Sequence, residues 1–416
     1  LKNGKIFLDI SGEIALYIMK KVPGVLKYMK ARYKAVFVDE YQDTKELQYV
    51  ILGAILKTGK DNKAFIVGDP NQSIYGNLGG FPMDKAQLEN VTGLYYDELS
   101  LSYNYRSSSL LVSYFDYFET YANKIEAVGK TKDYQSVISY NKTVSVEDLE
   151  NEIVRIIKTN IDEYRISPNE ICILAPQWIH LSGLTRNLMA RLPQYSFDGP
   201  GMAPFARDID NFWYKLSRII LTDSTPGLYI RRLRWASEIV TNLLSIGVTN
   251  IDLSAKQILY ICNSISINEQ DGLEYLKKFF DAFLERVNID INQNKYLKMH
   301  YDAFFDSSEK RIDSLKKKGA EFIMHIDAFR KVFQQKKGIT ISTNHGVKGA
   351  EFDTVIAFGL LDGYVPHFSE SNKEESAKRI LYVIASRARK NLYLISEQGR
   401  NKTPTPILSK YGYKYK

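Results

Sequence analysis

Residues 35–44 read AVFVDEYQDT, an apolar run that ends abruptly in two adjacent acids, Asp39 and Glu40. In open α/β sheets, ligands bind beyond the carboxyl ends of the strands. Mg²⁺ takes hard oxygen ligands and is commonly held by one or two carboxylates together with substrate phosphates. Asp39 suits that role, and Glu40 is then placed to orient or deprotonate a water that attacks a phosphate. Ordinary turn chemistry also explains a strand followed by two acids, so other stretches must decide.

A second apolar run, residues 64–68, leads into the polar stretch GDPNQSIYG at 68–76. Gly68 lets the backbone turn, and the amide of Gln72 can sense a phosphate. The alternative is a plain polar turn after a strand.

Six apolar runs are continuous rather than alternating, which predicts buried strands of parallel sheets: 35–39, 64–68, 171–175, 339–343, 354–358 and 392–396. Helical patterns cover 10–29, 46–56, 107–123, 146–163, 182–192 and 375–387. Between about 223 and 336 the strand patterns stop, and amphipathic helices are predicted at 227–244, 254–264, 271–287 and 302–333. Repeated strand–helix units predict an α/β fold, and the helical block predicts an insertion. Residues 402–416 are predicted to form a tail.

The composition favours a polyanionic partner. The 416 residues carry a formal net charge of +8 and a sequence pI of about 9.0, which places nucleic acid first among partners, although a basic surface can also serve solubility alone. No apolar run is long enough to span a bilayer, so we expect no membrane partner and a cytoplasmic location. Cys172 and Cys262 lie in apolar surroundings, which predicts buried, reduced thiols.

Three further stretches extend the pattern: LSYNYRSS at 101–108, STNHGVKGAEF at 342–352 and KRILYVIASRA at 378–388. Together with residues 35–44 and 68–76, they resemble five ordered motifs of the UvrD/Rep family of superfamily 1 helicases. The two strand ends resemble the family's Walker B motif and its glutamine-bearing motif III, and the other stretches resemble motifs IV, V and VI. Residues 195–210 also resemble a family element.

The resemblance implies an α/β fold with two RecA-like P-loop NTPase-type parallel-sheet domains and a helical insertion domain. The first parallel-sheet domain would occupy residues 1–97 and be incomplete, which would expose a sheet edge. The second would combine residues 98–222 and 337–416 around a helical accessory domain at 223–336. The family's activity implies an ATP-dependent DNA helicase or translocase, in a pathway such as DNA repair, acting on single-stranded or partly duplex DNA. A protein partner such as a nuclease is a further expectation.

The resemblance also implies roles for the nucleotide site, with ATP and Mg²⁺ as cofactors. Asp39 and Glu40 would hold Mg²⁺, and Glu40 would act as catalytic base. Gln72 would contact the γ-phosphate or the attacking water. Arg106 and Arg387 would reach ATP from the second domain, where a planar guanidinium fork offsets the charge that spreads over the γ-phosphate.

Further contacts are implied around motifs III and V. Gly349 and Glu351 would meet the ribose and phosphates of ATP. DNA contacts are expected from four residues: Tyr75, Thr343, Asn344 and His345. A stacking role for Tyr75 competes with ordinary packing, since the chain has 29 tyrosines, and His345 is as readily a structural residue.

Two departures from the family pattern bear on activity. The phosphate-binding loop G-x-x-x-x-G-K-[ST] should precede residue 35, and residues 1–34 contain no such string. We therefore expect the loop upstream of Leu1 in the full-length protein, and expect the chain alone to bind nucleotide weakly without hydrolysing it. Asn77 stands where the family has an aromatic base-stacking platform. These departures leave a second function open: a degenerate motor that binds nucleic acid or a protein without ATPase activity.

Overall fold

The chain divides into two units in the computed structural model, residues 1–177 with 342–416 and residues 178–341. The structure describes residues 8–57, 62–76, 79–199, 203–206, 208–248, 253–317, 321–333, 338–410 and 413–415. Within these ranges, no helix combines the length and the apolar character that crossing a membrane requires. These two units do not correspond one to one with the three predicted domains, so the domain boundaries given above remain a prediction.

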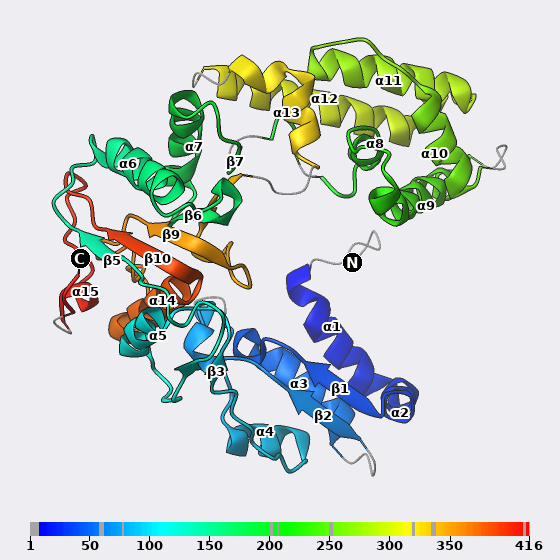
Figure 1. Ribbon diagram of the computed structural model, residues 1–416. Helices are drawn as coiled ribbons and strands as arrows, with labels where there is room; N and C mark the ends of the chain where they lie inside the picture. Colours follow the sequence, from blue (N-terminus) through cyan, green and yellow to red (C-terminus); the bar gives the residue numbers. More distant parts are fainter. Residues whose placement is uncertain are drawn as a thin grey trace. The chain divides into compact units, whose positions relative to one another are not determined.

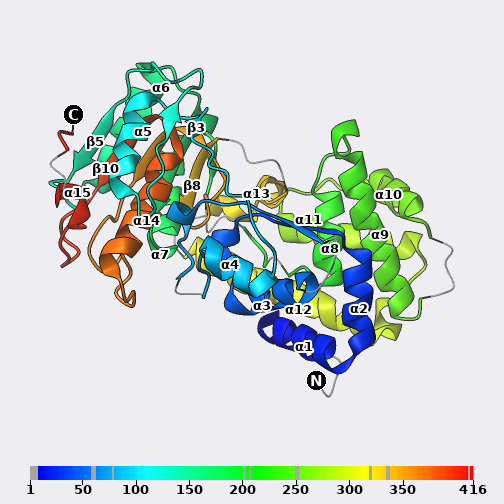
Figure 2. The ribbon, with the colours of Figure 1, turned by 90° about the horizontal axis from the view of Figure 1, so that it is seen from below.

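The first unit begins with four helices and a parallel strand pair: α1 (Leu8–Lys21), α2 (Pro23–Arg32), β1 (Ala35–Val38), α3 (Glu46–Leu56), β2 (Lys63–Ile66) and α4 (Lys85–Thr92) (Figures 1 and 2). In the strand pair, Ala35 lies opposite Lys63 and Val38 opposite Ile66. The helical pattern at 10–29 is two helices, because Pro23 has no N–H to continue a helix and its fixed φ suits a first turn.

β1 and β2 are less buried than the sequence predicts. Their side chains alternate between half-buried and exposed, and Phe37 and Phe65 are 77% and 57% exposed, with ring centroids 6.0 Å apart. Alternation of this kind is typical of strands that are covered on one face. The prediction of fully buried strands at 35–39 and 64–68 is therefore wrong, although both strands form where expected.

A larger sheet has the strand order β5-β10-β9-β6-β8-β7. The strand pairs β5–β10, β10–β9, β9–β6 and β7–β8 are all parallel. The bounds are β5 (Ile138–Asn141), β6 (Ile171–Ala175), β7 (Phe197–Asp198), β8 (Ile339–Thr343), β9 (Phe352–Ala357) and β10 (Ala388–Ile395); a short parallel pair joins β3 (Tyr103–Asn104) to β4 (Glu126–Ala127). The predicted α/β class with parallel sheets is confirmed.

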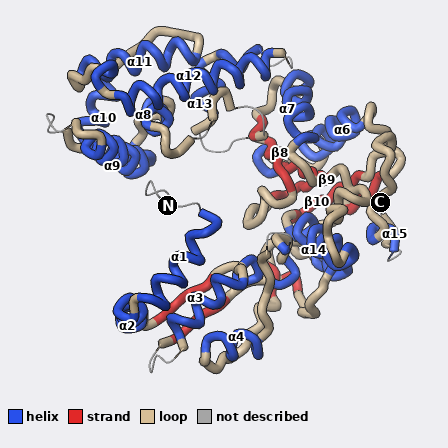
Figure 3. The backbone as a smooth tube through the Cα atoms, turned by 180° about the vertical axis from the view of Figure 1, so that it is seen from behind, coloured by secondary structure: helices blue, strands red, loops and turns tan. Residues whose placement is uncertain are grey.

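Helices form a layer on each face of this sheet. α5 (Ser109–Phe115) and α14 (Lys373–Ser386) lie on one face, and α6 (Leu149–Asp162) lies on the other (Figures 1 and 3). Leu111 and Val383 from the first layer pack in one apolar cluster with Val355 and Leu392 of the sheet. This packing fixes the last turn of α14 relative to the strand ends, where several candidate site residues lie.

A buried polar network joins α6 to the sheet. The side-chain oxygen of Asn160 accepts hydrogen bonds from Thr354 Oγ1 at 2.7 Å and Asn391 Nδ2 at 2.9 Å, and its Nδ2 donates to Ile156 O at 2.9 Å. Asn391 Oδ1 in turn accepts from Val137 N at 3.0 Å, which positions the start of β5. Because the three polar side chains are fully buried, each depends on the others for its partners.

α5 is shorter than the helix predicted at 107–123, which is therefore wrong in its second half. The helix ends at Phe115 and passes through a 3₁₀ turn at Asp116–Phe118. Beyond it, the backbone N–H groups of Thr120 and Tyr121 both donate to Asn71 Oδ1 at 2.8 Å, so a contact with the loop after β2 replaces the helical hydrogen bonds.

The predicted tail at 402–416 packs on the first unit, so that prediction is wrong for the described part. α15 (Ile407–Lys410) buries Ile407 and Leu408. Tyr415 donates from its hydroxyl to Leu408 O at 2.9 Å, and its ring lies against Tyr114 of α5. The alternation of Tyr and Lys at this end predicts a tail, but Tyr413 and Tyr415 pack against the apolar core of the first unit.

The second unit is mostly helical (Figure 3): α7 (Ile179–Arg191), α8 (Phe212–Ile220), α9 (Tyr229–Ser245), α10 (Ala255–Ser264), α11 (Gly272–Arg286), α12 (Lys295–Lys316) and α13 (Ile326–Lys331). Its core is aromatic, and Trp213 donates from Nε1 to Leu297 O at 2.9 Å. The single helix predicted at 302–333 is wrong, because α12 ends at Lys316 and His325 caps a new helix by accepting from Asp327 N. Cys172 and Cys262 are buried, as predicted.

Replacing Asn160 with alanine tests the buried network. We expect Asn160→Ala to lower the free energy of unfolding by about 2–4 kcal/mol, since Thr354 and Asn391 would each lose a buried partner. Urea unfolding followed by circular dichroism measures the change. Asn151→Ala, on the exposed face of the same helix, is the matched control and should change stability by less than about 0.5 kcal/mol. Equal losses in the two variants would contradict the role of the network.

Candidate nucleotide site

The two acids predicted to bind metal and water lie on a sharp turn at the carboxyl end of β1. Glu40 has a φ of +52°, in the left-handed region that bulky residues rarely adopt. Its N–H donates to Asp39 Oδ1 at 2.9 Å, and both side chains are exposed. Strained backbone of this kind persists where its surroundings hold it, and it gathers at functional sites.

The buried side chain of Gln42 ties this acid pair to the end of β2. Its Nε2 donates to Glu40 Oε2 at 2.5 Å, and its Oε1 accepts from the backbone N–H of Asp69 at 3.1 Å. Gly68 lies so close that a Cβ atom there would stand 2.1 Å from Gln42 Oε1. Only glycine fits at this position, so the two strand ends are held as one piece.

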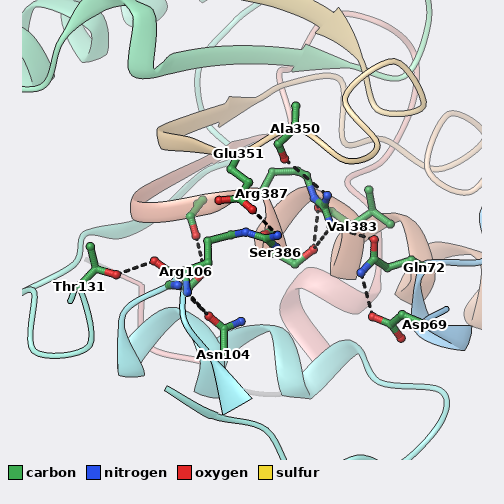
Figure 4. Close-up of polar contacts among 12 residues, drawn as sticks. Asp69, Gln72, Asn104, Arg106, Thr131, Ala350, Glu351, Val383, Ser386 and Arg387 are labelled. Atoms are coloured by element: carbon green, nitrogen blue, oxygen red, sulfur yellow. Dashed lines mark hydrogen bonds and ion pairs between the residues drawn. The ribbon is translucent and has the colours of Figure 1, made fainter. Parts of the chain in front are cut away.

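The amide of Gln72 lies between an acid and an arginine (Figure 4). Its Nε2 donates to Asp69 Oδ2 at 2.9 Å, and its Oε1 accepts from Arg387 Nη2 at 2.8 Å. The bond to Arg387 joins residues 315 positions apart in the sequence. Motifs III and VI, which the sequence predicts to act on the same phosphate, are therefore in direct contact.

Arg387 is a buried charge at the end of α14, with 2% of its surface exposed. Besides Gln72, its guanidinium donates to Val383 O at 3.2 Å and Ser386 Oγ at 3.0 Å, and Nη1 lies 3.5 Å from Ala350 O. Burial, and then the charge of nearby Arg106, lower the pKa of Arg387 to about 10. The group is still protonated at neutral pH, and neutral oxygens rather than a direct carboxylate surround it.

Arg106 is the second predicted arginine and lies on the same side (Figure 4). Its Nη2 forms an ion pair with Glu351 Oε1 at 2.5 Å, and its Nη1 donates to Ser386 O at 3.2 Å. The hydrogen bond from Arg106 lowers the pKa of Glu351. Asn104 holds the turn by accepting from the backbone N–H of Arg106 at 2.9 Å. Glu351 thus pairs with an arginine here, whereas the family resemblance implies a contact with the ribose and phosphates of ATP.

These contacts form a continuous series from the acid pair to the arginines. Glu40 contacts Gln42, Gln42 contacts Asp69, Asp69 contacts Gln72, and Gln72 contacts Arg387. Each link uses a donor of one residue and an acceptor of the next. The acid pair and Arg387 are therefore connected through side chains and the backbone N–H of Asp69.

Lys348 was not among the predicted site residues, although it lies in the stretch that resembles motif V. Its Nζ forms an ion pair with Asp43, which follows the acid pair, and lies 3.3 Å from Glu40 Oε2. The side chain is only 11% exposed, and its Nζ also lies 5.7 Å from the centre of the Tyr75 ring. Its position within the motif-like stretch 342–352 could have identified Lys348 as a candidate site residue.

The residues predicted to contact DNA differ in exposure. Tyr75 and His345 lie together, with ring centroids 5.4 Å apart, and His345 Nε2 lies 3.3 Å from Ile74 O. Thr343 and Asn344 are buried, and the hydroxyl of Thr343 accepts from Gly346 N at 3.1 Å. A DNA role for all four stays a prediction. Asn77 lies outside the described residues.

The acid pair fits Mg²⁺ by its chemistry. Asp39 and Glu40 offer hard carboxylate oxygens on an exposed turn, and the side chain of Glu40 is 51% exposed. Among the residues described by the structure, no group of three or more His, Cys, Asp or Glu side chains could hold a metal by itself. A Mg²⁺ ion that is also bound by phosphates needs only one or two carboxylates from the protein.

Gly349, which the resemblance places next to ATP, has a φ of +83°, and a Cβ atom at this position would have no heavy atom within 4 Å beyond its neighbours in the chain.

The ion pair of Lys348 can be compared with an exposed one. We expect Lys348→Met to lower the free energy of unfolding by about 1–3 kcal/mol, since two acids lose a largely buried partner. Lys410→Met removes a lysine that pairs with Glu374 at 2.7 Å, where both side chains are more than half exposed, and should cost less than about 1 kcal/mol. Urea unfolding measures both, and equal costs would contradict a structural role for Lys348.

The chain resembles known DNA helicases. Residues 7–90 match the UvrD/REP helicase N-terminal domain, and residues 274–399 match the UvrD-like helicase C-terminal domain. The ATP-dependent DNA helicase PcrA of Staphylococcus aureus is 23% identical over 92% of this chain and 57% of its own length. DNA helicase II of Rickettsia typhi is 24% identical over 94% of this chain and 64% of its own length.

A solved structure, the C-terminal domain of a possible DNA helicase from Lactobacillus plantarum, matches 73% of this chain and 92% of its own, at 11% identity and a TM-score of 0.30. The chain spans between half and two thirds of the length of the two curated relatives named above. The two matched domain regions, in family order, together cover just over half of its 416 residues. The chain belongs to the UvrD/Rep-like DNA helicase family.

Proposed function

We propose that the full-length protein is an ATP-dependent DNA helicase that couples ATP hydrolysis to movement along single-stranded DNA. The observation that carries this proposal is the hydrogen bond between Gln72 and Arg387, because it joins the strand end that follows the acid pair to the arginine at the end of α14. Phosphoryl transfer depends on positioning and charge stabilisation, and both kinds of group meet here.

In the proposed reaction, Asp39 and Glu40 would hold Mg²⁺, which would offset the charge of the phosphates when bound. Glu40 orients the attacking water and accepts its proton. Gln72 contacts the γ-phosphate or that water. Arg106 and Arg387 stabilise the negative charge that develops on the γ-phosphate, and an arginine in this role contributes roughly 10³–10⁵ in rate in other nucleotide hydrolases. Before that, each arginine must exchange a present partner, Glu351 or Gln72, for phosphate.

Coupling to DNA is proposed to use two short segments. Gln72 and Tyr75 lie on one, and His345 and Lys348 lie on the other. The segments touch through the ring pair of Tyr75 and His345, and Gln72 precedes this candidate base-stacking ring by three residues. Stacking on a single strand needs only a ring face and tolerates any base, which suits a motor that moves along DNA. The net charge of +8 supports a polyanionic partner.

The central test is the ATPase activity of the full-length protein with and without single-stranded DNA. We expect DNA to stimulate turnover, and Glu40→Gln to lower kcat by at least about 100-fold with a smaller change in KM, because a general base contributes roughly 10²–10⁴. Glu46→Gln, at an exposed position on the first turn of α3, is the matched control and should keep wild-type turnover. Wild-type protein without turnover in either condition would reject the proposal in favour of a binding module.

The chain of residues 1–416 provides a separate test. We expect it to show no ATP turnover and only weak nucleotide binding, because the sequence has no phosphate-binding loop before residue 35. A coupled-enzyme ATPase assay and titration with a fluorescent ATP analogue measure the two properties. A rate above the protein-free blank that Glu40→Gln abolishes would refute this expectation.

A further inference from the structure

The amide of Gln72 has one orientation that satisfies both of its neighbours. A guanidinium has donors and no acceptor, and an ionised carboxylate has acceptors and no donor. The carbonyl Oε1 of Gln72 must therefore face Arg387 and its Nε2 must face Asp69, as the distances of 2.8 and 2.9 Å record. A flipped amide would set donor against donor at Arg387 and acceptor against acceptor at Asp69.

Both oxygens of the Asp69 carboxylate accept hydrogen bonds, so the carboxylate is a fixed reference for that amide. Its Oδ1 accepts from Asn71 N at 2.9 Å and begins the turn that carries Gln72. Its Oδ2 accepts from Gln72. On α14, the phenol of Tyr382 is buried, and this burial, followed by the charge of Asp69, raises the pKa of Tyr382.

We propose that Asp69 is a positioning residue that fixes the amide of Gln72 with its carbonyl toward Arg387. Asp69 itself would touch neither ATP nor water; it acts through Gln72, and its effect on turnover rests on the proposed function. The contact has a mechanical consequence, because Arg387 is buried and can give up the Gln72 carbonyl only for another acceptor. A phosphate oxygen is such an acceptor, so Asp69 keeps the arginine poised until phosphate arrives.

An exchange of acid and amide between positions 69 and 72 tests this arrangement. Asp69→Asn keeps the size of the side chain and the oxygen that caps the turn, but can turn an amide donor toward the donor of Gln72. Gln72→Glu sets a second carboxylate against Asp69. In the double variant, the new amide at 69 donates to the new carboxylate at 72, which still accepts from Arg387. The donor and acceptor are exchanged and both contacts return.

Hydrogen–deuterium exchange of the full-length protein reads out the contact without ATP. We expect peptides covering 70–76 and 380–390 to exchange about tenfold faster in each single variant, since a hydrogen bond to a charged group is lost, and to return to the wild-type rate in the double variant. Asp84→Asn, which replaces the carboxylate that caps α4 by accepting from Gln87 N at 2.8 Å, is the matched control and should leave both peptides unchanged. A double variant as fast as the singles would overturn the proposal.

The kinetic readout separates positioning from simple stability. We expect Asp69→Asn to lower kcat about tenfold while KM for ATP changes less than twofold, because only the orientation of one amide is lost. Equal kcat in Asp69→Asn and wild type would overturn the positioning role even if the exchange experiment succeeded. If the wild-type protein has no ATPase activity, the proposed function fails, and the exchange experiment alone decides whether Asp69 orients Gln72.

Discussion

The buried guanidinium of Arg387 imposes the strongest constraint on the first unit. A charge taken out of water is costly unless hydrogen bonds replace those of the solvent. Arg387 has neutral oxygens for partners: two on its own helix, the carbonyl of Ala350 and the amide of Gln72. These oxygens belong to three parts of the chain: α14, the loop before β9 and the turn after β2. Hydrogen bonding to one buried guanidinium therefore holds these three parts next to one another.

Much of this fold follows from the sequence. The strands at 171–175 and 339–343 form with the predicted bounds, because a short, continuous run of Ile, Leu and Cys, or of Ile and Thr, has few alternatives in a layered α/β structure. The contact between Gln72 and Arg387 was foreseen only as a convergence on one ligand. The resemblance named the two residues, and the local sequence on either side could not say that they touch each other.

Other features depend on partners that lie far away in the sequence. The helix predicted over 107–123 stops at Phe115, and beyond it the side chain of Asn71, distant in sequence, accepts hydrogen bonds from Thr120 and Tyr121. Lys348 was passed over as part of a motif string, and its acid partners lie about 300 residues away. Thr343 and Asn344 were expected at a DNA surface, and their burial depends on how the turn after β8 folds back on itself.

The two exposed phenylalanines of β1 and β2 bear on how copies of this chain behave in solution. A net charge of +8 makes copies repel each other when the ionic strength is low. Added salt shortens the range of that repulsion to about 10 Å at 0.1 M and about 3 Å at 1 M, while sulfate and similar ions strengthen apolar association. Mutual repulsion therefore favours the colloidal stability of residues 1–416, and a salting-out purification step would favour contact between the exposed Phe37 and Phe65 rings of different copies.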